Sequence, residues 1–469
     1  MNDPLRLSLV ELTGALRARK LSPVELMSAV FRRLDQRNPE LNAVVAMYER
    51  DALLAQAREA EARIARGAAR PLEGVPLGVK DLEDCAGLVT SHGSIPYKDN
   101  LAAHDSVQVA RLRGAGAIPI GKTNAPEFGH TAITKNLIFG VTRNPWNLEL
   151  TPGGSSGGSS AALAACMLPL VTASDGGGST RIPACFVGAF GMKPTQGRIP
   201  NESKNLWYYG DTAVQGPLTK TVADNALYLD VTSGYAPEDP NSLPHPGFSY
   251  QTKLAEGLPR KLRIAYSQDL GYAVVQSDIA QAVYDGAKLF EKLGHELVEI
   301  KGGPPKMGHA WGMWGAFELA AANLQHLPAR EAEFSRSVLA SMKLAWEMTP
   351  EWFREQATRR LELSRWCQSV FSEYDLLITP TVPYDPPPAK GPFPRETEGR
   401  AQLDWGVASF TIPFNLSLHP AASLRVGLSR AGLPIGLQIV AERHRDELVL
   451  QAAHAFERER PWHPHWPVR

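Results

Sequence analysis

The sequence predicts an α/β fold: one domain in which a mixed, mostly parallel central β-sheet is covered by helices on both faces. Two observations predict it. Short apolar runs typical of buried strands alternate with segments of helical periodicity, and capping patterns mark several helix starts. The chain has 469 residues, which is long enough to bury a large core. Because α/β proteins of this length often form one unit, we expect a single domain over 1–469.

The N-terminal part of the chain, 1–68, is predicted to form helices that wrap the core. Ser8 and Ser22 each precede a glutamate by three residues, which is the pattern of a capping box, and a proline follows Ser22 at the first helical position. Apolar residues then recur at every fourth position and indicate one apolar stripe. The segment 51–66 is rich in alanine and glutamate and is also predicted to be helical.

From Gly74 onward, predicted strands and helices alternate. Short apolar runs predict strands at 75–80, 117–120, 262–266, 295–300 and 432–440. Amphipathic patterns predict helices at 107–113 and 279–293, and Gly294 is a typical stop for the second of them. Two proline-rich stretches, 237–259 and 380–394, are predicted to be long surface loops rather than linkers, because strand patterns resume after each of them.

Composition excludes several classes of function. The 49 basic and 49 acidic residues cancel, so the broad basic excess typical of nucleic-acid-binding proteins is missing and we expect no nucleic-acid partner. The four cysteines form no CxxC pair and fit a reducing compartment; we expect no metal and no cofactor. The first residues lack a signal-peptide pattern, and the longest apolar stretch, 161–171, is too short to cross a bilayer. We therefore expect a cytoplasmic protein that does not interact with membranes.

Two segments unusually rich in glycine and serine, 151–160 and 174–184, carry the strongest chemical signal. Glycine permits backbone conformations in which successive N–H groups converge on an anion. Ser179 ends the glycine run of the second segment, where it could attack a carbonyl carbon while the amides hold the developing oxyanion. Flexible linkers share this composition, but here alanine-rich, apolar and proline-containing segments flank both runs and favour burial.

A nucleophilic serine needs a base, and no histidine stands near Ser155 or Ser179 in the sequence. Lys80 is the better candidate because it ends an apolar strand pattern, and burial makes an ammonium group lose its proton more readily. A neutral lysine can serve as the general base for a hydroxyl nucleophile. Taken alone, Lys80 could equally be a surface lysine paired with Asp81.

Five segments of the chain, in this order, resemble the hallmark segments of the amidase signature family. They are GVPLGVKD at 74–81, GKTN at 121–124, PGGSSGGS at 152–159, DGGGSTR at 175–181 and GMKPT at 191–195. The likeness extends over nearly the whole chain. It implies the amidase signature fold, with a catalytic core at about 69–235 and a C-terminal part, 260–469, that completes the sheet and its helices.

The resemblance implies a role for each matching residue. Ser179 would attack the amide carbonyl and become acylated, Ser155 in a cis peptide geometry would relay the proton, and Lys80 would be the base. The oxyanion hole would consist of the backbone amides of Gly176, Gly177, Gly178 and Ser179. Asp175 and Arg181 match family positions that brace this loop, and Ser156 would orient the relay.

The substrate pocket is the least defined part of these predictions. Ile138 and Phe139 before the relay serine, and Trp207 and Tyr208 after the nucleophile, would make the pocket apolar or aromatic if they line it; they could equally be core or rim residues. A second aromatic group has helical spacing and is predicted to pack in the core or at a dimer contact; its members are Trp311, Trp314 and Phe317. Both a monomer and a homodimer fit the sequence.

The implied activity is hydrolysis of the C–N bond of a linear aryl or alkyl amide of small size, through an acyl-enzyme; the same chemistry would extend to esters and carbamates. Aryl acylamidases and nylon-oligomer hydrolases are the members that the chain most resembles. The alternative within the family is the glutaminase subunit of a tRNA-dependent amidotransferase. A non-catalytic binder on the same scaffold is a third class, but the retention of Lys80, Ser155 and Ser179 argues against it.

Two other motif matches are set aside. Residues 116–123 fit the phosphate-loop pattern GxxxxGK[ST], but its four variable positions are apolar and are predicted to be a strand, where a phosphate-binding turn would be needed. Residues 153–157 fit the nucleophile-elbow pattern GxSxG, which would make Ser155 the acylated residue. An elbow follows directly on a hydrophobic strand, whereas the residues before 153 have the composition of a loop.

Overall fold

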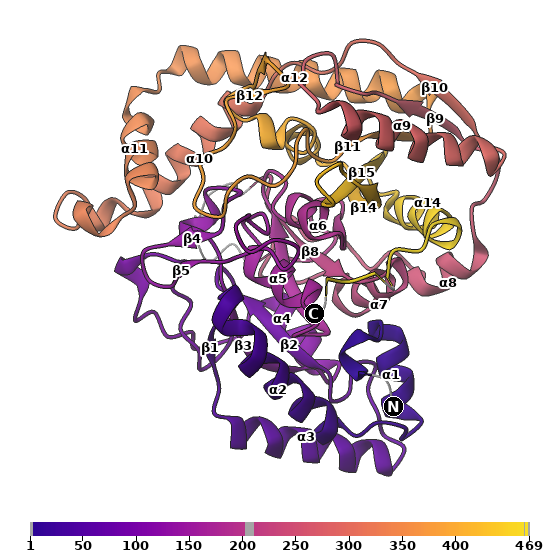
Figure 1. Ribbon diagram of the computed structural model, residues 1–469. Coiled ribbons are helices and arrows are strands. Elements are labelled where there is room, and N and C mark those ends of the chain that lie inside the picture. The colour runs from indigo at the N-terminus through magenta and orange to yellow at the C-terminus, as the bar shows by residue number, and fades with distance from the viewer. Residues whose placement is uncertain (1–2, 202–210, 464, 468–469) are drawn as a thin grey trace.

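One mixed β-sheet runs through the whole molecule and carries the helices on its two faces (Figure 1). The computed structural model describes residues 3–201, 211–463 and 465–467. Within them the sheet has 11 strands in the order β1-β3-β2-β6-β8-β7-β14-β15-β11-β9-β10. The predicted single α/β domain is confirmed.

The strands are short, and most of those in the middle of the sheet are buried. Their bounds are β1 Val44–Met47, β2 Pro76–Lys80, β3 Ile118–Thr123, β6 Leu170–Asp175, β7 Phe190–Lys193, β8 Val214–Thr219, β9 Arg263–Tyr266, β10 Glu296–Glu299, β11 Leu376–Pro380, β14 Ala421–Leu428 and β15 Pro434–Ala441. Two small sheets lie outside it, formed by β4 Lys135–Asn136 with β5 Gly140–Val141 and by β12 Glu396–Thr397 with β13 Arg400–Ala401. All five predicted strands are present within a few residues.

The prediction of a mostly parallel sheet is wrong. Parallel pairs occur only in two groups, β3–β2–β6 and β11–β9–β10. Every pairing between these groups, from β6 through β8, β7, β14 and β15 to β11, is antiparallel, as is β1 with β3. One physical reason is visible at β14–β15: the connection 429–433 is too short for the crossover that parallel strands need.

Helices cover both faces of the sheet, as neighbouring residues of β15 show. Successive residues of a strand point to opposite faces. A side chain at Gly436 would lie 2.6 Å from the Cys185 sulfur of α6, whereas Leu437 packs 3.1 Å from the position of a side chain at Gly286 of α9. Helix α6 therefore covers one face and α9 the other.

The remaining helices surround this layered core. The bounds are α1 Leu9–Arg17, α2 Pro23–Leu41, α3 Arg50–Ala65, α4 Val107–Gly114, α5 Gly157–Ala164, α6 Arg181–Val187, α7 Val222–Thr232, α8 Tyr250–Glu256, α9 Ser277–Lys292, α10 Gly308–Ala322, α11 Arg336–Leu344, α12 Pro350–Glu373, α13 Ile412–Leu416 and α14 Asp446–Glu459. The two capping boxes predicted at Ser8 and Ser22 are confirmed. Helices α10, α11 and α12 extend from the body of the molecule at the upper left of Figure 1. Within the described ranges, no helix is both long and apolar enough to cross a membrane.

The two proline-rich stretches differ from the prediction of surface loops. Residues 237–259 include the helix α8, whose Tyr250 and Leu254 are buried. In the stretch 380–394, Val382 and Tyr384 are buried, because apolar side chains between the prolines pack into a core cluster. This second stretch also forms part of a cavity wall.

Candidate active site

Lys80 lies at the carboxyl end of β2 and is buried, with 1% of its surface exposed. Its ammonium nitrogen Nζ lies 2.8 Å from Ser155 Oγ, 2.9 Å from Ser174 Oγ and 3.4 Å from the Ser174 carbonyl oxygen. Burial lowers the pKa of Lys80 to about 7, against the smaller opposing effects of the carboxylates of Asp175 and Glu83. A substantial fraction of Lys80 is therefore neutral near pH 7 and able to accept a proton.

Ser155 stands between Lys80 and a large cavity. The peptide bond from Gly154 to Ser155 is cis, as the family resemblance implies. Gly129 packs closely against the serine: a side chain there would lie 3.1 Å from Ser155 Oγ, and the φ of Gly129 is +69°. The segment before this serine, 151–156, is loop, and helix α5 begins only at Gly157. The strand that a nucleophile elbow requires is not found there.

Ser179 is half-buried and lines the cavity. Its backbone carbonyl accepts a hydrogen bond from the Ser156 amide at 3.3 Å, which joins the two glycine-rich loops side by side. Within the described residues the Ser179 hydroxyl makes no hydrogen bond, so the contact from Ser155 to Ser179 is not formed here. The Ser156 hydroxyl lies 3.3 Å from the Ser174 carbonyl oxygen and so holds the strand end that Lys80 also contacts.

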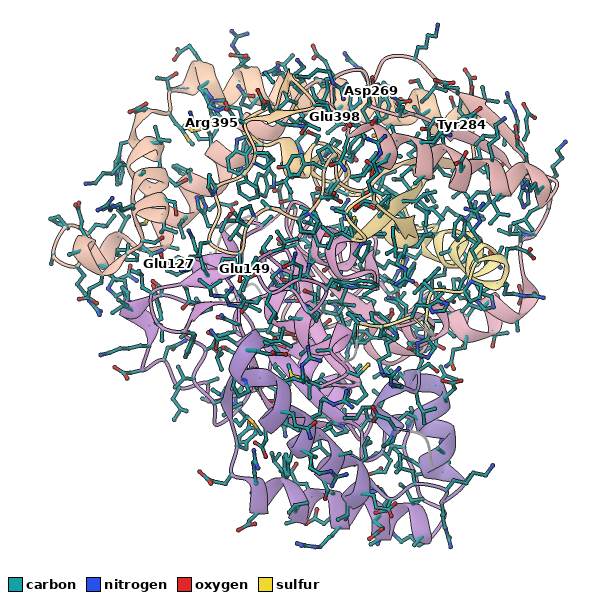
Figure 2. The ribbon with its side chains drawn as sticks, viewed as in Figure 1. Glu127, Glu149, Asp269, Tyr284, Arg395 and Glu398 are labelled. Carbon is teal, nitrogen blue, oxygen red and sulfur yellow. The ribbon has the colours of Figure 1, made fainter. Side chains whose placement is uncertain are left out.

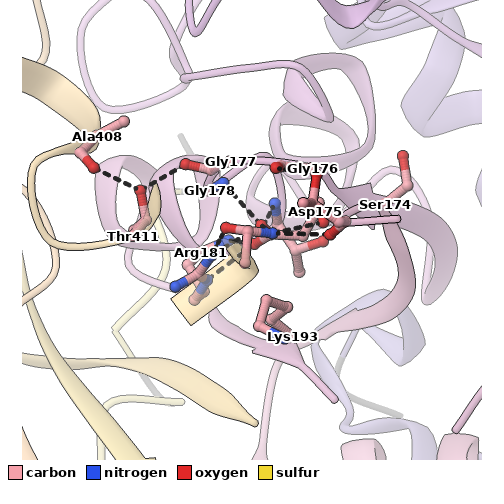
Figure 3. Close-up of polar contacts among 12 residues, drawn as sticks. Ser174, Asp175, Gly176, Gly177, Gly178, Arg181, Lys193, Ala408 and Thr411 are labelled. Atoms are coloured by element: carbon pink, nitrogen blue, oxygen red, sulfur yellow. Dashed lines mark hydrogen bonds and ion pairs between the residues drawn. The ribbon is translucent and has the colours of Figure 1, made fainter. Parts of the chain in front are cut away.

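Asp175 and Arg181 brace the loop that carries Ser179 (Figure 3). Both side chains are completely buried, and Arg181 Nη2 lies 2.8 Å from Asp175 Oδ1. Burial alone would raise the pKa of Asp175, but the charge and hydrogen bonds of Arg181, with the amide of Asn415, hold it well below its usual value. The same carboxylate accepts hydrogen bonds from the backbone amides of Gly178, Thr180 and Arg181. The ion pair therefore fixes the loop's backbone from inside.

This arrangement modifies the predicted oxyanion hole. The Gly178 amide points inward and donates to Asp175 Oδ1 at 2.7 Å, so it is not available to an oxyanion. The amides of Gly176, Gly177 and Ser179 make no hydrogen bond to any described residue. Gly177 and Ser179 also line the cavity. The carbonyls face the other way: that of Gly176 accepts from Trp311 Nε1 at 2.7 Å, and that of Gly177 from Thr411 Oγ1 at 2.6 Å.

Neither glycine has room for a side chain. A Cβ atom at Gly177 would lie 2.3 Å from Trp311, and one at Gly178 would lie 2.4 Å from Thr411 Oγ1. Gly178 also has a φ of +131°, which other residues rarely adopt. The glycine run is thus required by close contacts from α10 and from the loop before α13.

The cavity has a volume of about 820 Å³ and lies above Ser179. Its apolar wall is formed by Ile182, Trp311, Tyr384, Phe393 and Trp405. Charged side chains stand among the remaining lining residues, namely Lys135, Lys390, Arg395 and Asp404. Figure 2 shows Arg395 on the side of the molecule where α10 and α11 lie.

Several buried titratable groups near the site are not part of the proton chain. Lys193 has its pKa lowered to about 7 by burial, with a further decrease from Arg181, yet its Nζ contacts only the Pro194 carbonyl, at 3.0 Å. Lys122, at the end of the phosphate-loop pattern, donates to Thr90 Oγ1 at 3.1 Å and lies in β3. Burial lowers the pKa of His130, which lines the cavity, to about 4. In the described ranges no three His, Cys, Asp or Glu side chains gather to hold a metal ion.

Comparison with known proteins decides the family. The family model described as Amidase matches residues 25–450. The chain belongs to the amidase signature family. An acylamidase of Rhodococcus erythropolis is 37% identical over 464 residues, covering 97% of this chain and 96% of the relative. The corresponding subunit of the glutamyl-tRNA(Gln) amidotransferase of Geobacter sp. (strain M21) is 32% identical over 482 residues, covering 97% and 98%.

Solved structures agree with this assignment. A bacterial aryl acylamidase of the amidase signature family superposes with a TM-score of 0.92 at 29% identity, covering 98% of this chain and 97% of the other. A 6-aminohexanoate cyclic dimer hydrolase, solved with its substrate, superposes with a TM-score of 0.86 at 30% identity and covers 99% of each chain. This amidase is therefore a hydrolase of amide carbon–nitrogen bonds, similar over its full length to acylamidases.

The pocket residues are where sequence reasoning was weakest. Ile138 and Phe139 lie in the turn between β4 and β5 and are not among the described residues that line the cavity. Trp207 and Tyr208 lie outside the described residues. Trp311 does pack in a core cluster, as predicted, but its indole also reaches the loop of Ser179 and lines the cavity. Its helical spacing with Trp314 concealed this second role.

Proposed function

We propose that this amidase cleaves small linear amides with an apolar or aromatic part through an acyl-enzyme on Ser179. Ser155 relays the proton and Lys80 is the base. The observation that carries the proposal is the 2.8 Å contact between Lys80 Nζ and Ser155 Oγ, directly beside the loop that presents Ser179 to the cavity. The aromatic wall of that cavity supports an aryl or alkyl substrate.

In this mechanism the proton of the Ser179 hydroxyl passes through Ser155 to neutral Lys80 as the oxygen attacks the carbonyl carbon. The free amides of Gly176, Gly177 and Ser179 stabilise the oxyanion; one such donor is typically worth about 10²–10³ in rate. The Lys80 ammonium then returns a proton through Ser155 to the leaving amine. Water deacylates Ser179 by the same route, since the proton chain works in both directions.

The acylated serine can be identified directly. The enzyme is treated with a fluorophosphonate, and the labelled peptide is located by mass spectrometry in the wild type and in Ser179→Ala, Ser155→Ala and Ser337→Ala. Ser337 is a matched control because it lines the same cavity but is exposed and has no contact with Lys80. We expect the label on Ser179 in the wild type and in Ser337→Ala and no label in Ser179→Ala. A label on Ser155 would transfer the nucleophile to the elbow motif.

A substrate panel separates the stand-alone amidase from the glutaminase alternative, which the amidotransferase relatives keep in view. Release of 4-nitroaniline from 4-nitroacetanilide is measured beside release of ammonia from glutamine. We expect turnover of the anilide and none of glutamine. The reverse result would indicate a glutaminase that works with partner proteins.

A further inference from the structure

A second cavity lies directly behind the first. It has a volume of about 270 Å³ and is lined by the start of α10 and the end of the loop 400–412. Four residues line both cavities: Leu403, Asp404, Trp405 and Ala408. The two spaces are therefore separated by one short stretch of chain, in which Trp405 is by far the largest side chain.

The indole of Trp405 is seated in a groove of α10. A side chain at Gly308 would lie 2.8 Å from Trp405 Cβ, and one at Gly312 would lie 2.3 Å from its Cζ2. These glycines are four residues apart and so share one face of the helix. The ring of Trp311 meets Trp405 edge-to-face, with centroids 5.4 Å apart. Two glycines and one aromatic neighbour thus hold this ring between the cavities.

We propose that Trp405 is a partition that sets the length of substrate the active site accepts, and that the space behind it is an unused extension of the substrate cavity. The proposal rests on the amidase activity proposed above. Removal of the indole joins the two cavities, because the other residues of the shared wall are smaller. A chain too long for the first cavity then has a path beyond Trp405 toward Met307 and Ile412.

The test compares long and short substrates in Trp405→Ala. One arm lengthens the acyl part, from 4-nitroacetanilide to 4-nitrooctananilide; the other lengthens the amine part, from N-acetyl-4-methylaniline to N-acetyl-4-hexylaniline. We expect the long-to-short ratio of kcat/KM to rise at least about 10-fold in one arm, since a single methylene is worth about 10–200-fold in an apolar pocket. The arm that responds identifies which half of the substrate faces Trp405.

Trp314→Ala is the matched control. Trp314 lies on the same helix and loses the same ring, but it packs against Trp352 and Phe353 away from both cavities. Its long-to-short ratio should equal that of the wild type. Should Trp405→Ala fail to fold, Trp405→Leu keeps an apolar side chain in the groove and is expected to shift the ratio in the same direction by a smaller factor.

Binding separates this inference from the proposed function. The dissociation constants of the same four amides are measured on Ser179→Ala and on the double variant with Trp405→Ala. A selective gain for a long amide supports the partition even if the wild type hydrolyses none of them. Unchanged ratios in both arms, for binding as well as for turnover, would overturn the partition whatever the activity of the wild type.

Discussion

Lys80, Ser155 and Ser179 stand on backbone held by buried polar contacts, whereas the opposite side of the cavity, 308–408, consists of large side chains packed on one another. On the first side, the Asp175–Arg181 ion pair and three backbone amides fix the loop of Ser179. On the second, aromatic rings such as Trp311 and Trp405 meet edge-to-face and fill grooves made by glycines.

The difference separates chemistry from selection. Hydrogen bonds and ion pairs impose direction, so they suit groups that must transfer a proton along a defined line. Apolar packing has no direction, so its side chains can change in size while the fold is kept. We therefore expect substitutions on the first side to abolish turnover for every amide and those on the second side to change which amides are preferred.

The largest expected effect distinguishes two buried lysines. Lys80→Met should lower kcat by about 10²–10⁴, the usual loss on removal of a positioned base. The protein should remain folded, because an apolar chain of similar volume replaces a buried amine. Lys193→Met is the matched control: its pKa is also lowered to about 7 by burial, but its Nζ contacts a backbone carbonyl and no serine.

We expect Lys193→Met to keep kcat within about tenfold of the wild type, since it removes no group from the proton chain. Thermal unfolding of both variants shows whether the fold is kept. Equal losses of kcat in two folded variants would mean that a buried amine anywhere beneath the loop is sufficient, and that the contact with Ser155 is not what matters.

The pH profile gives the next largest effect. Burial lowers the pKa of Lys80 to about 7, and the neutral amine is the active form. Below pH 7 the neutral fraction, and with it kcat/KM for 4-nitroacetanilide, should fall about tenfold per pH unit; above pH 7 the profile should level off. Burial lowers the pKa of His92 and His130 to about 4, so neither accounts for an inflection near pH 7.

Lys193→Met again supplies the control, because its amine titrates in the same range. The inflection should persist in Lys193→Met and disappear from the residual activity of Lys80→Met. A profile of the wild type that is flat from pH 6 to 9, with chemistry rate-limiting, would contradict the lysine base.

The two sides also differ in how far the sequence predicts them. The strand before Lys80, the loops of Ser155 and Ser179 and the buried Asp175–Arg181 pair follow from contiguous motifs, because each motif encodes its own backbone. The antiparallel centre of the sheet could not be predicted in this way, since pairing such as β7 with β14 joins segments far apart in the chain. The same holds for the cavity wall, where Phe393 and Trp405 meet Trp311 only through folding.

Even within the motifs, direction escaped prediction. The four amides of 176–179 look equivalent in the sequence, but the Gly178 amide turns inward to Asp175. The sequence offered one signal for this, an aspartate at the start of the glycine run, because a buried carboxylate needs backbone donors near it. That signal supports an oxyanion hole of fewer amides.

Trp311 tests whether the two sides are independent, and it has the smallest expected effect. Its Nε1–H donates to the Gly176 carbonyl at 2.7 Å, the one direct polar link from α10 to the oxyanion loop found in the described residues. Trp311→Phe keeps an aromatic ring in the wall but removes the donor, and one such hydrogen bond is worth about 0.5–1.5 kcal/mol. If the link orients the loop, kcat for 4-nitroacetanilide should fall by roughly 2–12-fold. Trp314→Phe, which has no contact with the loop, should leave kcat unchanged. A change confined to KM in Trp311→Phe would show that the aromatic side selects the substrate and has no part in orienting the amides.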